Sequence, residues 1–284
     1  MQMFTQEALQ TFRKNVYEAT SRTPSFHLVL GSGFKQGLGD LWSEGFTVRK
    51  TVKFSEIPGI PQATVPDHEG SFLCVDGPKN SFIVQVGRLH GYEGLTPKSV
   101  VLPLALSHAC GLKDYILTNA AGGLDPLHRP GHVMLIRDQI NFTGANPLSG
   151  TVPVSPAGEP LGPRFPDCTT MFDKSASYRF RDFLSAQSLT VHEGIYIGVA
   201  GPNFETPAEI RAYQKLGAQA VGMSTVWEST YLNFVGARIV GLSLISNLGA
   251  GLFDGKLDHF KVVETCKFSA TKILRGLFQG IQNH

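Results

Sequence analysis

Short apolar runs, rich in β-branched residues, recur along the chain and are separated by glycine and other turn-forming residues. Runs without polar alternation are typical of strands that are buried on both faces. Between several of them, apolar residues recur at helical spacing, which indicates amphipathic helices. The predicted strands are Phe26 to Leu30, Phe82 to Val86, Tyr115 to Thr118, Val133 to Ile136, Ile195 to Val199 and Ile239 to Ile245, and the predicted helices are Gln6 to Tyr17, Pro97 to Cys110, Asp173 to Ala186, Pro207 to Leu216 and His259 to Ile281.

The order of these elements predicts the fold class. Strands alternate with helices, which is the pattern of an α/β fold. Neither a repeat nor a Gly/Ser linker interrupts residues 1–284, so we expect a single domain. The segment Phe142 to Met171 follows neither period and is rich in glycine, proline and serine, which predicts a long loop. In the last predicted helix, the apolar face consists of Val263, Ala270, Ile273, Leu274, Leu277 and Ile281.

Composition narrows the classes of partner. The chain has 25 Lys and Arg residues against 23 Asp and Glu residues, a formal net charge of +2, and the charges are spread along the sequence. A nucleic-acid binder or a membrane-surface protein would concentrate positive charge, so we expect neither partner and favour a small ligand. The four cysteines are far apart, which fits a reducing compartment, and residues 1–15 do not resemble a secretion signal. Both observations favour the cytoplasm.

Two polar, glycine-rich turns follow predicted strands. The GSG turn at residues 31–33 comes directly after the first strand, where backbone N–H groups and a serine hydroxyl can face an anion. In the segment at residues 87–94, Arg88, His90 and Tyr92 occupy alternate positions and would share one side of an extended chain. The planar guanidinium of arginine commonly donates two hydrogen bonds to phosphate oxygens. These three side chains therefore suit an oxyanion beside a sugar or ring. The alternatives, a simple strand-to-loop turn and a solvated edge turn, stay open from these residues alone.

Other candidates lie near the ends of later strands. Thr118 to Gly123 and Gly222 to Thr225 predict small-residue turns at the carboxyl ends of strands, where open α/β sheets bind ligands, although small residues also permit tight helix packing. Glu205 precedes a proline-initiated helix and fits either catalysis or a favourable charge at a helix N-terminus. Asn247 follows a strand, where its amide can bind the edge of a planar heterocycle or form a turn.

The histidines do not predict a metal site. His128 and His132 are four residues apart, but a Pro-Gly pair separates them and breaks the helical face that such a ligand pair would use.

Taken together, a set of short motifs resembles the trimeric purine nucleoside phosphorylases in order and spacing, from about Leu30 to His259. The motifs are LGSGF at residues 30–34, TVPDHEG at 64–70, GRLHGYEG at 87–94, TNAAGGL at 118–124, GPNFET at 201–206, GMSTV at 222–226 and SN at 246–247. The resemblance implies a single α/β domain with a twisted, mixed central sheet flanked by helices. It also implies a homotrimeric pentosyltransferase that needs no cofactor or metal and uses inorganic phosphate as a co-substrate.

The implied reaction is the reversible phosphorolysis of a purine nucleoside to the free base and a pentose 1-phosphate. Two subsites are needed, because phosphate must approach one face of the sugar while negative charge builds up on the departing base. By resemblance, the phosphate subsite consists of Ser32, Arg88, His90, the Ala120 backbone N–H and Ser224, the ribose contacts are Tyr92, Met223 and His259, and His68 belongs to a flexible gate.

By the same resemblance, Glu205, Asn247 and Phe204 hold the purine, and His90 acts in catalysis with the first two. Asparagine at position 247 goes with 6-oxopurines, since its amide can donate to N7, whereas the related methylthioadenosine phosphorylases carry aspartate there. Inosine, guanosine and their deoxyribonucleosides are therefore the expected substrates. The rival interpretations are a phosphorylase that accepts xanthosine, a nucleosidase that uses water, and a non-catalytic purine-binding protein.

Three features depart from the family pattern. Leu161 stands where many relatives have an aromatic residue that reaches the ribose site of a neighbouring subunit. In the first turn, Phe34-Lys35-Gln36 replaces smaller residues, and Lys35 either adds positive charge near the phosphate or is solvated. Trp227 replaces a proline after the Ser-Thr-Val sequence.

Overall fold

The computed structural model describes residues 2–64, 70–253 and 259–284, and the side chains of residues 259–266 and 268 lie outside this description. In the described chain, nine strands form one mixed sheet in the order β2-β3-β4-β1-β5-β8-β7-β6-β9. The strands are β1 (Phe26–Leu30), β2 (Thr47–Lys53), β3 (Ser71–Asp76), β4 (Ser81–Val86), β5 (Asp114–Gly123), β6 (Val133–Asn141), β7 (Val191–Gly198), β8 (Ala220–Gly222) and β9 (Arg238–Leu248).

The centre of the sheet consists of strands that the apolar runs predicted. β1 is buried at every position and pairs in parallel with β4 on one side and with β5 on the other. A strand that is covered on both faces has no solvated side, which explains why these runs lack polar alternation. Each predicted strand is present, and the predicted α/β class with a mixed central sheet is confirmed.

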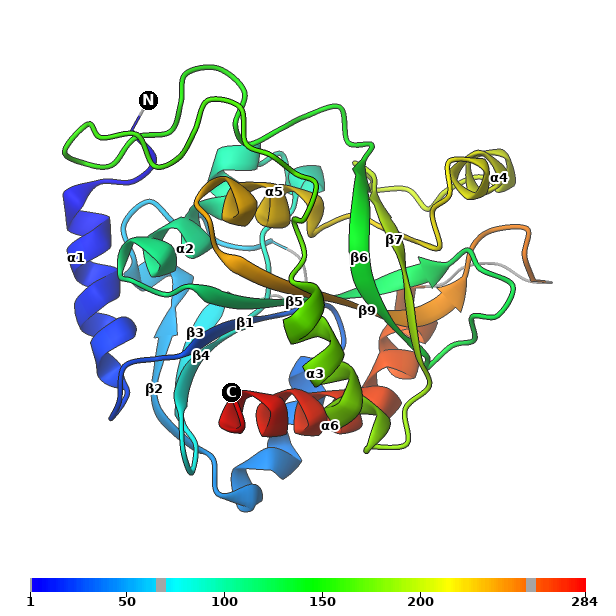
Figure 1. The fold of residues 1–284 in the computed structure, drawn as a ribbon, viewed down its shortest axis with the longest axis horizontal. Helices are drawn as coiled ribbons and strands as arrows, with labels where there is room; N and C mark the ends of the chain where they lie inside the picture. Colours follow the sequence, from blue (N-terminus) through cyan, green and yellow to red (C-terminus); the bar gives the residue numbers. More distant parts are fainter. Residues whose placement is uncertain (1, 65–69, 254–258) are drawn as a thin grey trace.

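Part of the sheet closes on itself. β5 pairs with β8 and β9 as well as with β1, and β6 pairs with both β7 and β9. With the β7–β8 pairing, the strands β5, β8, β7, β6 and β9 form a ring. Figure 1 shows β6 and β7 running across the direction of β5 and β9. The ring brings the ends of β5, β8 and β9 together, because each is paired within it.

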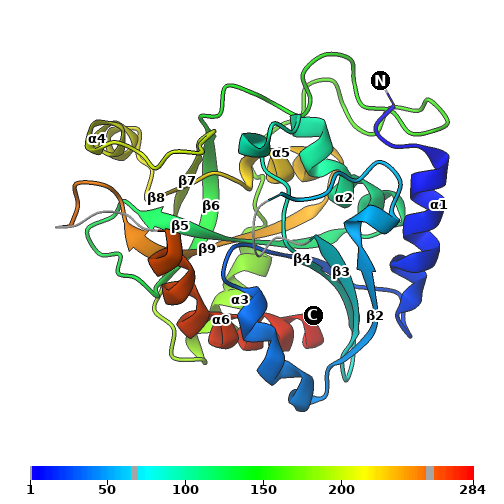
Figure 2. The same cartoon turned by 180° about the vertical axis from the view of Figure 1, so that it is seen from behind.

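Helices cover both faces of the sheet (Figures 1 and 2). α3, α6 and the 3-10 segment η2 pack on one face, and α1, α2 and α5 lie on the other. The helices are α1 (Gln6–Asn15), α2 (Pro97–Ala109), α3 (Lys174–Ser185), α4 (Pro207–Lys215), α5 (Val226–Phe234) and α6 (His259–Gln282), and the 3-10 segments are η1 (Tyr17–Ala19), η2 (Lys35–Glu44), η3 (Phe54–Glu56) and η4 (Gly91–Glu93). Among the described residues, no helix is long and apolar enough to cross a membrane.

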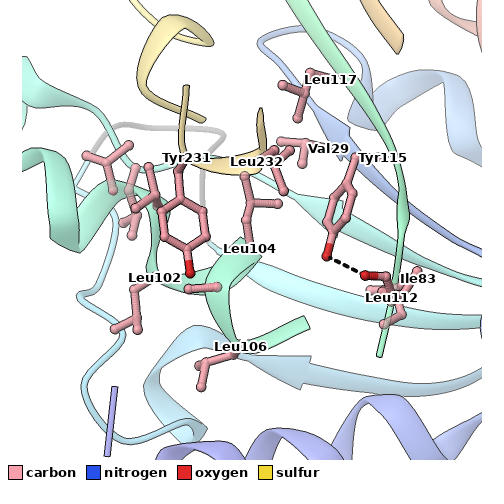
Figure 3. Close-up of a cluster of buried hydrophobic side chains, with 14 of the residues drawn as sticks. Val29, Ile83, Leu102, Leu104, Leu106, Leu112, Tyr115, Leu117, Tyr231 and Leu232 are labelled. Carbon is pink, nitrogen blue, oxygen red and sulfur yellow. Dashed lines mark hydrogen bonds between the residues drawn. The ribbon is translucent and has the colours of Figure 1, made fainter. Parts of the chain in front are cut away.

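Two hydrophobic layers hold these helices against the sheet. Figure 3 shows Tyr231 and Leu232 of α5 beside Leu104 of α2, facing Val29 and Tyr115 from the central strands. All five side chains are buried, and full burial of such a side chain contributes about 1.5–3 kcal/mol. On the opposite face, the predicted apolar side of α6 is confirmed at its described positions, Ala270, Ile273, Leu274, Leu277 and Ile281, whereas the Val263 side chain lies outside the described part.

Several local predictions were incomplete or wrong. Thr118 to Gly123 was predicted as a turn, but these residues continue β5, because backbone pairing with β8 and β9 extends the strand. The strands β2 and β3 and the helix α5 were not predicted, since β2 is largely exposed and α5 lacks a one-sided apolar pattern. The prediction of a long loop was correct, because residues 142–172 form no helix or strand and contain only isolated β-bridges at Val154.

Candidate active site

The GSG turn lies against Arg88 and β5. The Gly31 N–H donates to Thr118 Oγ1 at 3.1 Å. A Cβ at Gly31 would come within 2.8 Å of Asn119 Cα and 3.3 Å of Arg88 Nη1, so this close approach requires glycine. Ser32, the next residue, is half-buried. The structure therefore brings together two turns that the sequence presented separately.

Buried partners hold Arg88 in one orientation. Its Nε donates to Glu228 Oε1 at 2.9 Å, and its Nη1 donates to the Thr118 carbonyl at 2.8 Å. The side chains of Arg88 and Glu228 are each 2% exposed, so the charges compensate each other away from water. Glu228, in the first turn of α5, was missed by the sequence interpretation, because an acidic residue at a helix start is common.

Glu93 links His90 to the chain just before residue 65. Its Oε1 accepts from the His90 backbone N–H at 2.8 Å and lies 3.1 Å from His90 Nδ1. Its Oε2 accepts from the Thr64 backbone N–H at 2.7 Å and from the Thr64 hydroxyl at 2.8 Å. Burial would raise the pKa of Glu93, but the hydrogen bonds from His90 and Thr64 outweigh burial and hold the pKa at about 2. The sequence interpretation did not single out Glu93 either.

The surroundings of His90 disfavour its charged form. Burial is the main cause that lowers its pKa, and the positive charge of Arg88 acts in the same direction, against the hydrogen bond and charge of Glu93. Because the Glu93 carboxylate accepts from Nδ1–H, Nε2 of the neutral imidazole carries the lone pair and acts as an acceptor toward a ligand.

Tyr92 and Met223, the expected ribose contacts, meet beside His90. Tyr92 stacks on His90 with ring centroids 4.6 Å apart and an interplanar angle of 16°. A Cβ at Gly201 would lie 2.5 Å from Met223 Sδ and 3.4 Å from Tyr92 Cδ1, so both side chains converge on that glycine. Burial raises the pKa of Tyr92, and its hydroxyl therefore remains a donor.

The side chains of two expected site residues, His259 and His68, are not among those that the structure describes. His259 begins α6, but its side chain lies outside the described part of the chain. His68, the expected gate residue, lies outside the described residues.

Ser224 lies in the tight link between β8 and α5. The Tyr196 hydroxyl is 3.4 Å from Ser224 N and 3.3 Å from Ser224 O. The next residue, Thr225, has a φ of 70°, which a β-branched residue rarely adopts. Its hydroxyl accepts from Asn119 Nδ2 at 2.9 Å and lies 3.1 Å from Ser224 Oγ. The surrounding contacts thus impose a strained backbone, of the kind that concentrates at functional sites.

A small cavity connects these groups. Its volume is about 20 Å³, and its walls include His90, Met223, Ser224 and Trp227. His90 follows β4, Met223 and Ser224 belong to the β8–α5 link, and Trp227 is the second residue of α5. The cavity therefore joins two expected phosphate ligands with an expected ribose contact.

Asn247 and Ala120 lie on the neighbouring strands β9 and β5. Asn247 is within β9, so the alternative of a turn-forming asparagine is wrong. Its Oδ1 accepts from Ser246 Oγ at 2.7 Å, and its Nδ2 donates to the Leu248 carbonyl at 2.9 Å. These contacts distinguish the donor end of the amide from its acceptor end. Ala120 is half-buried in β5.

Glu205 is half-buried in the loop before α4. Burial is the main cause that raises its pKa, and the charge of Glu209 adds to it. Thr206 and Glu209 form the capping box of α4, so the stabilising charge at this helix start belongs to Glu209 rather than to Glu205. Phe204, beside Glu205, is 39% exposed. Gly251, which follows β9, packs against Pro207 and brings the chain after Asn247 to the same region.

The remaining candidates lie apart from this group or lack its geometry. Lys35 is exposed at the start of η2, and Leu161 packs against the hydrophobic layer of its own chain. His132 Nδ1 lies 2.9 Å from His192 Nε2, and the His128 ring is also close to His192. Within the described ranges, no three His, Cys, Asp or Glu residues are arranged to hold a metal ion.

Comparison with known proteins gives consistent matches. The model of the phosphorylase superfamily matches residues 33–277. Purine nucleoside phosphorylase 1 of Bacillus subtilis is 39% identical over 242 residues, which cover 85% of this chain and 86% of that protein. The purine nucleoside phosphorylase of Bos taurus is 36% identical over 277 residues, which cover 95% and 92%.

A solved structure agrees with the sequence matches. The crystal structure of a Schistosoma purine nucleoside phosphorylase in complex with hypoxanthine superposes with a TM-score of 0.81 at 27% sequence identity. The match covers 99% of this chain and 98% of that chain, so the similarity extends over the whole architecture.

Proposed function

Since the chain belongs to the phosphorylase superfamily and to its purine nucleoside phosphorylases, we propose that it catalyses the reversible phosphorolysis of 6-oxopurine ribonucleosides and deoxyribonucleosides. Inosine and guanosine are the main substrates, and the products are the free base and ribose or deoxyribose 1-phosphate. The observation that carries the proposal is that two expected phosphate contacts, His90 and Ser224, and an expected sugar contact, Met223, lie beside one another around one small cavity.

Phosphate is held by donors from three turns. We assign this subsite to Ser32, Arg88, His90, the Ala120 backbone N–H and Ser224. Arg88 is suited to the task because Glu228 and Thr118 hold its planar fork in place before phosphate arrives. With His90 Nδ1 facing Glu93, we assign Nε2 to phosphate, where it accepts from the P–OH group of hydrogen phosphate. Prior orientation lowers the entropic cost of placing phosphate beneath the sugar.

The sugar lies between phosphate and base. We assign its contacts to Tyr92, Met223 and His259, with His259 near the 5′-hydroxyl and His68 in the gate over the site. The convergence of Tyr92 and Met223 at Gly201, next to His90, supports this assignment for the two described side chains. Phosphate then attacks C1′ as the bond between C1′ and N9 breaks, and the electron pair of that bond moves into the purine.

The base leaves with negative charge, which the Asn247 amide stabilises, while Glu205 and Phe204 hold the purine ring in place. The Glu205 carboxylate accepts from a ring N–H, and the Asn247 amide donates to N7 as electron density builds up there. Phe204 contributes apolar contact to the purine. A 6-oxopurine offers the matching donors and acceptors, and the relative of known structure is described in complex with hypoxanthine, a 6-oxopurine.

We further propose that residues 1–284 form one domain, that the protein is a cytoplasmic homotrimer, and that it needs no cofactor or metal besides its co-substrate phosphate. It binds neither nucleic acid nor membranes. The trimer rests on the resemblance to the trimeric family. Sedimentation at micromolar concentration would give about three times the chain mass of 30.8 kDa, whereas a monomer would contradict the trimer.

The direct test is to incubate the protein with inosine, guanosine, xanthosine or adenosine, with and without phosphate, and to measure free base and sugar phosphate. We expect phosphate-dependent cleavage of inosine and guanosine. Efficient cleavage of xanthosine would widen the substrate range, and cleavage without phosphate would identify a nucleosidase. Tight purine binding without any turnover would identify a binding protein and contradict the proposal.

A further inference from the structure

Trp227 packs directly on the backbone that follows His90. It is the second residue of α5, and its six-membered ring lies over Gly91. A Cβ at Gly91 would come within 2.5 Å of Trp227 Cη2 and 2.9 Å of Cζ3. Non-bonded carbon atoms do not approach this closely, so the indole occupies the space that a side chain at position 91 would need.

The indole N–H attaches the start of the long loop to the same place. It donates to Thr143 Oγ1 at 2.9 Å and lies 3.2 Å from the Ala145 carbonyl. The Thr143 hydroxyl donates in turn to Asn141 Oδ1 at 2.7 Å, and Asn141 Nδ2 donates to the Ala145 carbonyl at 2.8 Å. Residues 141–145 therefore form a hydrogen-bonded turn that Trp227 connects to Gly91.

Trp227 also forms one wall of the cavity that His90, Met223 and Ser224 share. A single side chain thus contacts the His90 turn, the start of the 142–172 loop and the space beside the phosphate and ribose groups. The three heavy atoms nearest to a Cβ built at Gly91 all belong to this ring. The indole therefore limits where the turn at Gly91 can lie.

We propose that Trp227 is a positioning residue of the phosphate subsite, which holds the turn at Gly91, and with it His90, in the geometry that binds phosphate. The inference rests on the proposed function, because it assumes that His90 contacts phosphate. Trp227 itself need not touch phosphate. Its loss should weaken phosphate binding more than it slows the chemical step, because the catalytic groups at the base lie on other elements.

The first experiment compares Trp227→Phe with Trp42→Phe. Phenylalanine removes the indole N–H and the ring atoms nearest Gly91, and Trp42, on η2 beside Phe278, offers a matched tryptophan outside the site. With inosine saturating, we expect Trp227→Phe to raise the phosphate KM about tenfold while kcat changes less than about threefold. The control should keep both constants, and unfolding of both variants should be measured alongside.

The second experiment tests the contact itself. Gly91→Ala places a methyl group against the indole, so we expect it to raise the phosphate KM at least about tenfold. In the double variant with Trp227→Phe, the methyl group has room, so the added effect of Gly91→Ala should largely disappear. A general loss of stability would instead make the two effects additive, and that result would overturn the inference.

The Trp42→Phe variant also supplies a direct binding signal. The chain has two tryptophans, so Trp227 is the remaining emitter in this variant. Titration with inorganic phosphate alone should change its fluorescence, with a midpoint that rises about tenfold when Gly91→Ala is added. If Gly91→Ala leaves the phosphate midpoint unchanged, the inference fails.

The outcomes separate this inference from the proposed function. A wild-type protein that cleaves inosine without phosphate refutes the proposed function, and the inference with it. A phosphate-dependent wild-type enzyme whose phosphate KM is unchanged in Trp227→Phe refutes the inference alone.

Discussion

Two carboxylates, Glu93 and Glu228, orient the residues that we assign to phosphate. Glu228 holds the guanidinium of Arg88, and Glu93 holds the imidazole of His90. Both cationic or donor groups are buried, so each would be costly to leave without its acceptor. At the scale of single residues, we therefore expect phosphate affinity to depend on two acidic side chains that would repel phosphate if they contacted it directly.

We predict that Glu228→Gln lowers both stability and phosphate affinity. Glutamine keeps the shape and one acceptor, but it leaves the charge of Arg88 uncompensated in a buried place, which should cost about 3 kcal/mol of unfolding free energy. The matched control is Glu44→Gln, because Glu44 pairs with Arg275 at a site where each side chain is about one third exposed. Breaking that pair should cost less than about 1 kcal/mol. Urea unfolding of both variants, together with the phosphate KM, would show the contrast, and equal costs would contradict the buried-pair argument.

We predict that Asn247→Asp shifts substrate preference from inosine toward adenosine. The amide donor, which faces the Leu248 carbonyl and which we assign to N7 of the base, is replaced by an acceptor. An acceptor disfavours N7 of a 6-oxopurine and accepts from the amino group of adenine. The ratio of kcat/KM for inosine to that for adenosine should fall at least about tenfold. An unchanged ratio would remove Asn247 from base recognition.

We predict that Glu205→Gln sharply lowers inosine phosphorolysis. The half-buried carboxylate loses the charge that favours a ring N–H of the departing base, and about a hundredfold loss of kcat is expected. Glu209→Gln is the matched control, since Glu209 caps α4 four residues away and is exposed. It should affect the stability of α4 rather than turnover. Near-normal turnover in Glu205→Gln would exclude Glu205 from the site.

At the scale of elements, close backbone contact decides where the helices sit. η2 follows the GSG turn and packs on α6, and the two meet at Gly37. A Cβ at Gly37 would come within 2.7 Å of backbone atoms of Ala270 and Thr271, whereas one at Gly39 would meet nothing within 4 Å. Backbone atoms of a helix cannot move aside as a flexible side chain can, so position 37 sets the spacing between η2 and α6.

Gly37→Ala and Gly39→Ala should therefore differ strongly. We predict that the first lowers the unfolding free energy by about 1–3 kcal/mol, because it forces η2 away from α6. The second should be neutral, or stabilising by up to about 1 kcal/mol, because alanine has the smaller backbone entropy to lose. Denaturant unfolding of the two variants measures the difference, and equal stabilities would refute this account of the η2–α6 contact.

At the scale of the whole molecule, neutral histidines are part of the core. His27 is fully buried in β1, with Nδ1 2.9 Å from Ser107 Oγ, and burial lowers its pKa to about 3. Burial, aided by the charge of Lys113, lowers the pKa of His108 to about 4. The native protein therefore binds protons at these sites only in strong acid.

Stability should fall as the pH falls below about 6.5. In the unfolded chain, histidine has a pKa near 6.5, so from that pH down to about 4 the unfolded state binds protons that the folded state does not. Each of the two histidines should then lower the unfolding free energy by about 0.7 kcal/mol per pH unit at pH 6.5, where the unfolded imidazole is half protonated, and by about 1.4 kcal/mol per pH unit near pH 5. The effect of the histidines is best measured between about pH 6.5 and 5, where Glu93 does not contribute to the change in stability. The fold lowers the pKa of Glu93, so its stabilising effect is lost only below its unfolded pKa near 4.5.

The measurement is urea unfolding between pH 5 and 6.5, with His27→Asn and His108→Asn compared to the wild type. Averaged over this range, each substitution should reduce the slope of unfolding free energy against pH by about 1 kcal/mol per unit. The less deeply buried His108 provides a second test if His27→Asn does not fold. A slope that neither substitution changes would contradict the role of these histidines.

Several features were predictable because they depend on local sequence. The apolar runs located β1, β4 and the core of β9, and the periodic face of α6 was correct where its side chains are described. Glycine-rich turns after strands pointed to Ser32 and Arg88 for the same local reason. The site residues of the separate motifs could be recognised as one set only because the motifs together resemble a known family.

The tertiary structure decided what depends on contacts between distant parts of the chain. Backbone pairing turned the predicted turn at residues 118–123 into the second half of β5 and closed the ring through β9. Glu228 lies 140 positions from Arg88, and Trp227 lies 84 positions from Thr143, so no local pattern marks either pair. The sequence by itself determined the central strands and the amphipathic helices, because burial periodicity is local. The partners that orient Arg88, His90 and the Gly91 turn were decided only when folding brought distant segments into contact.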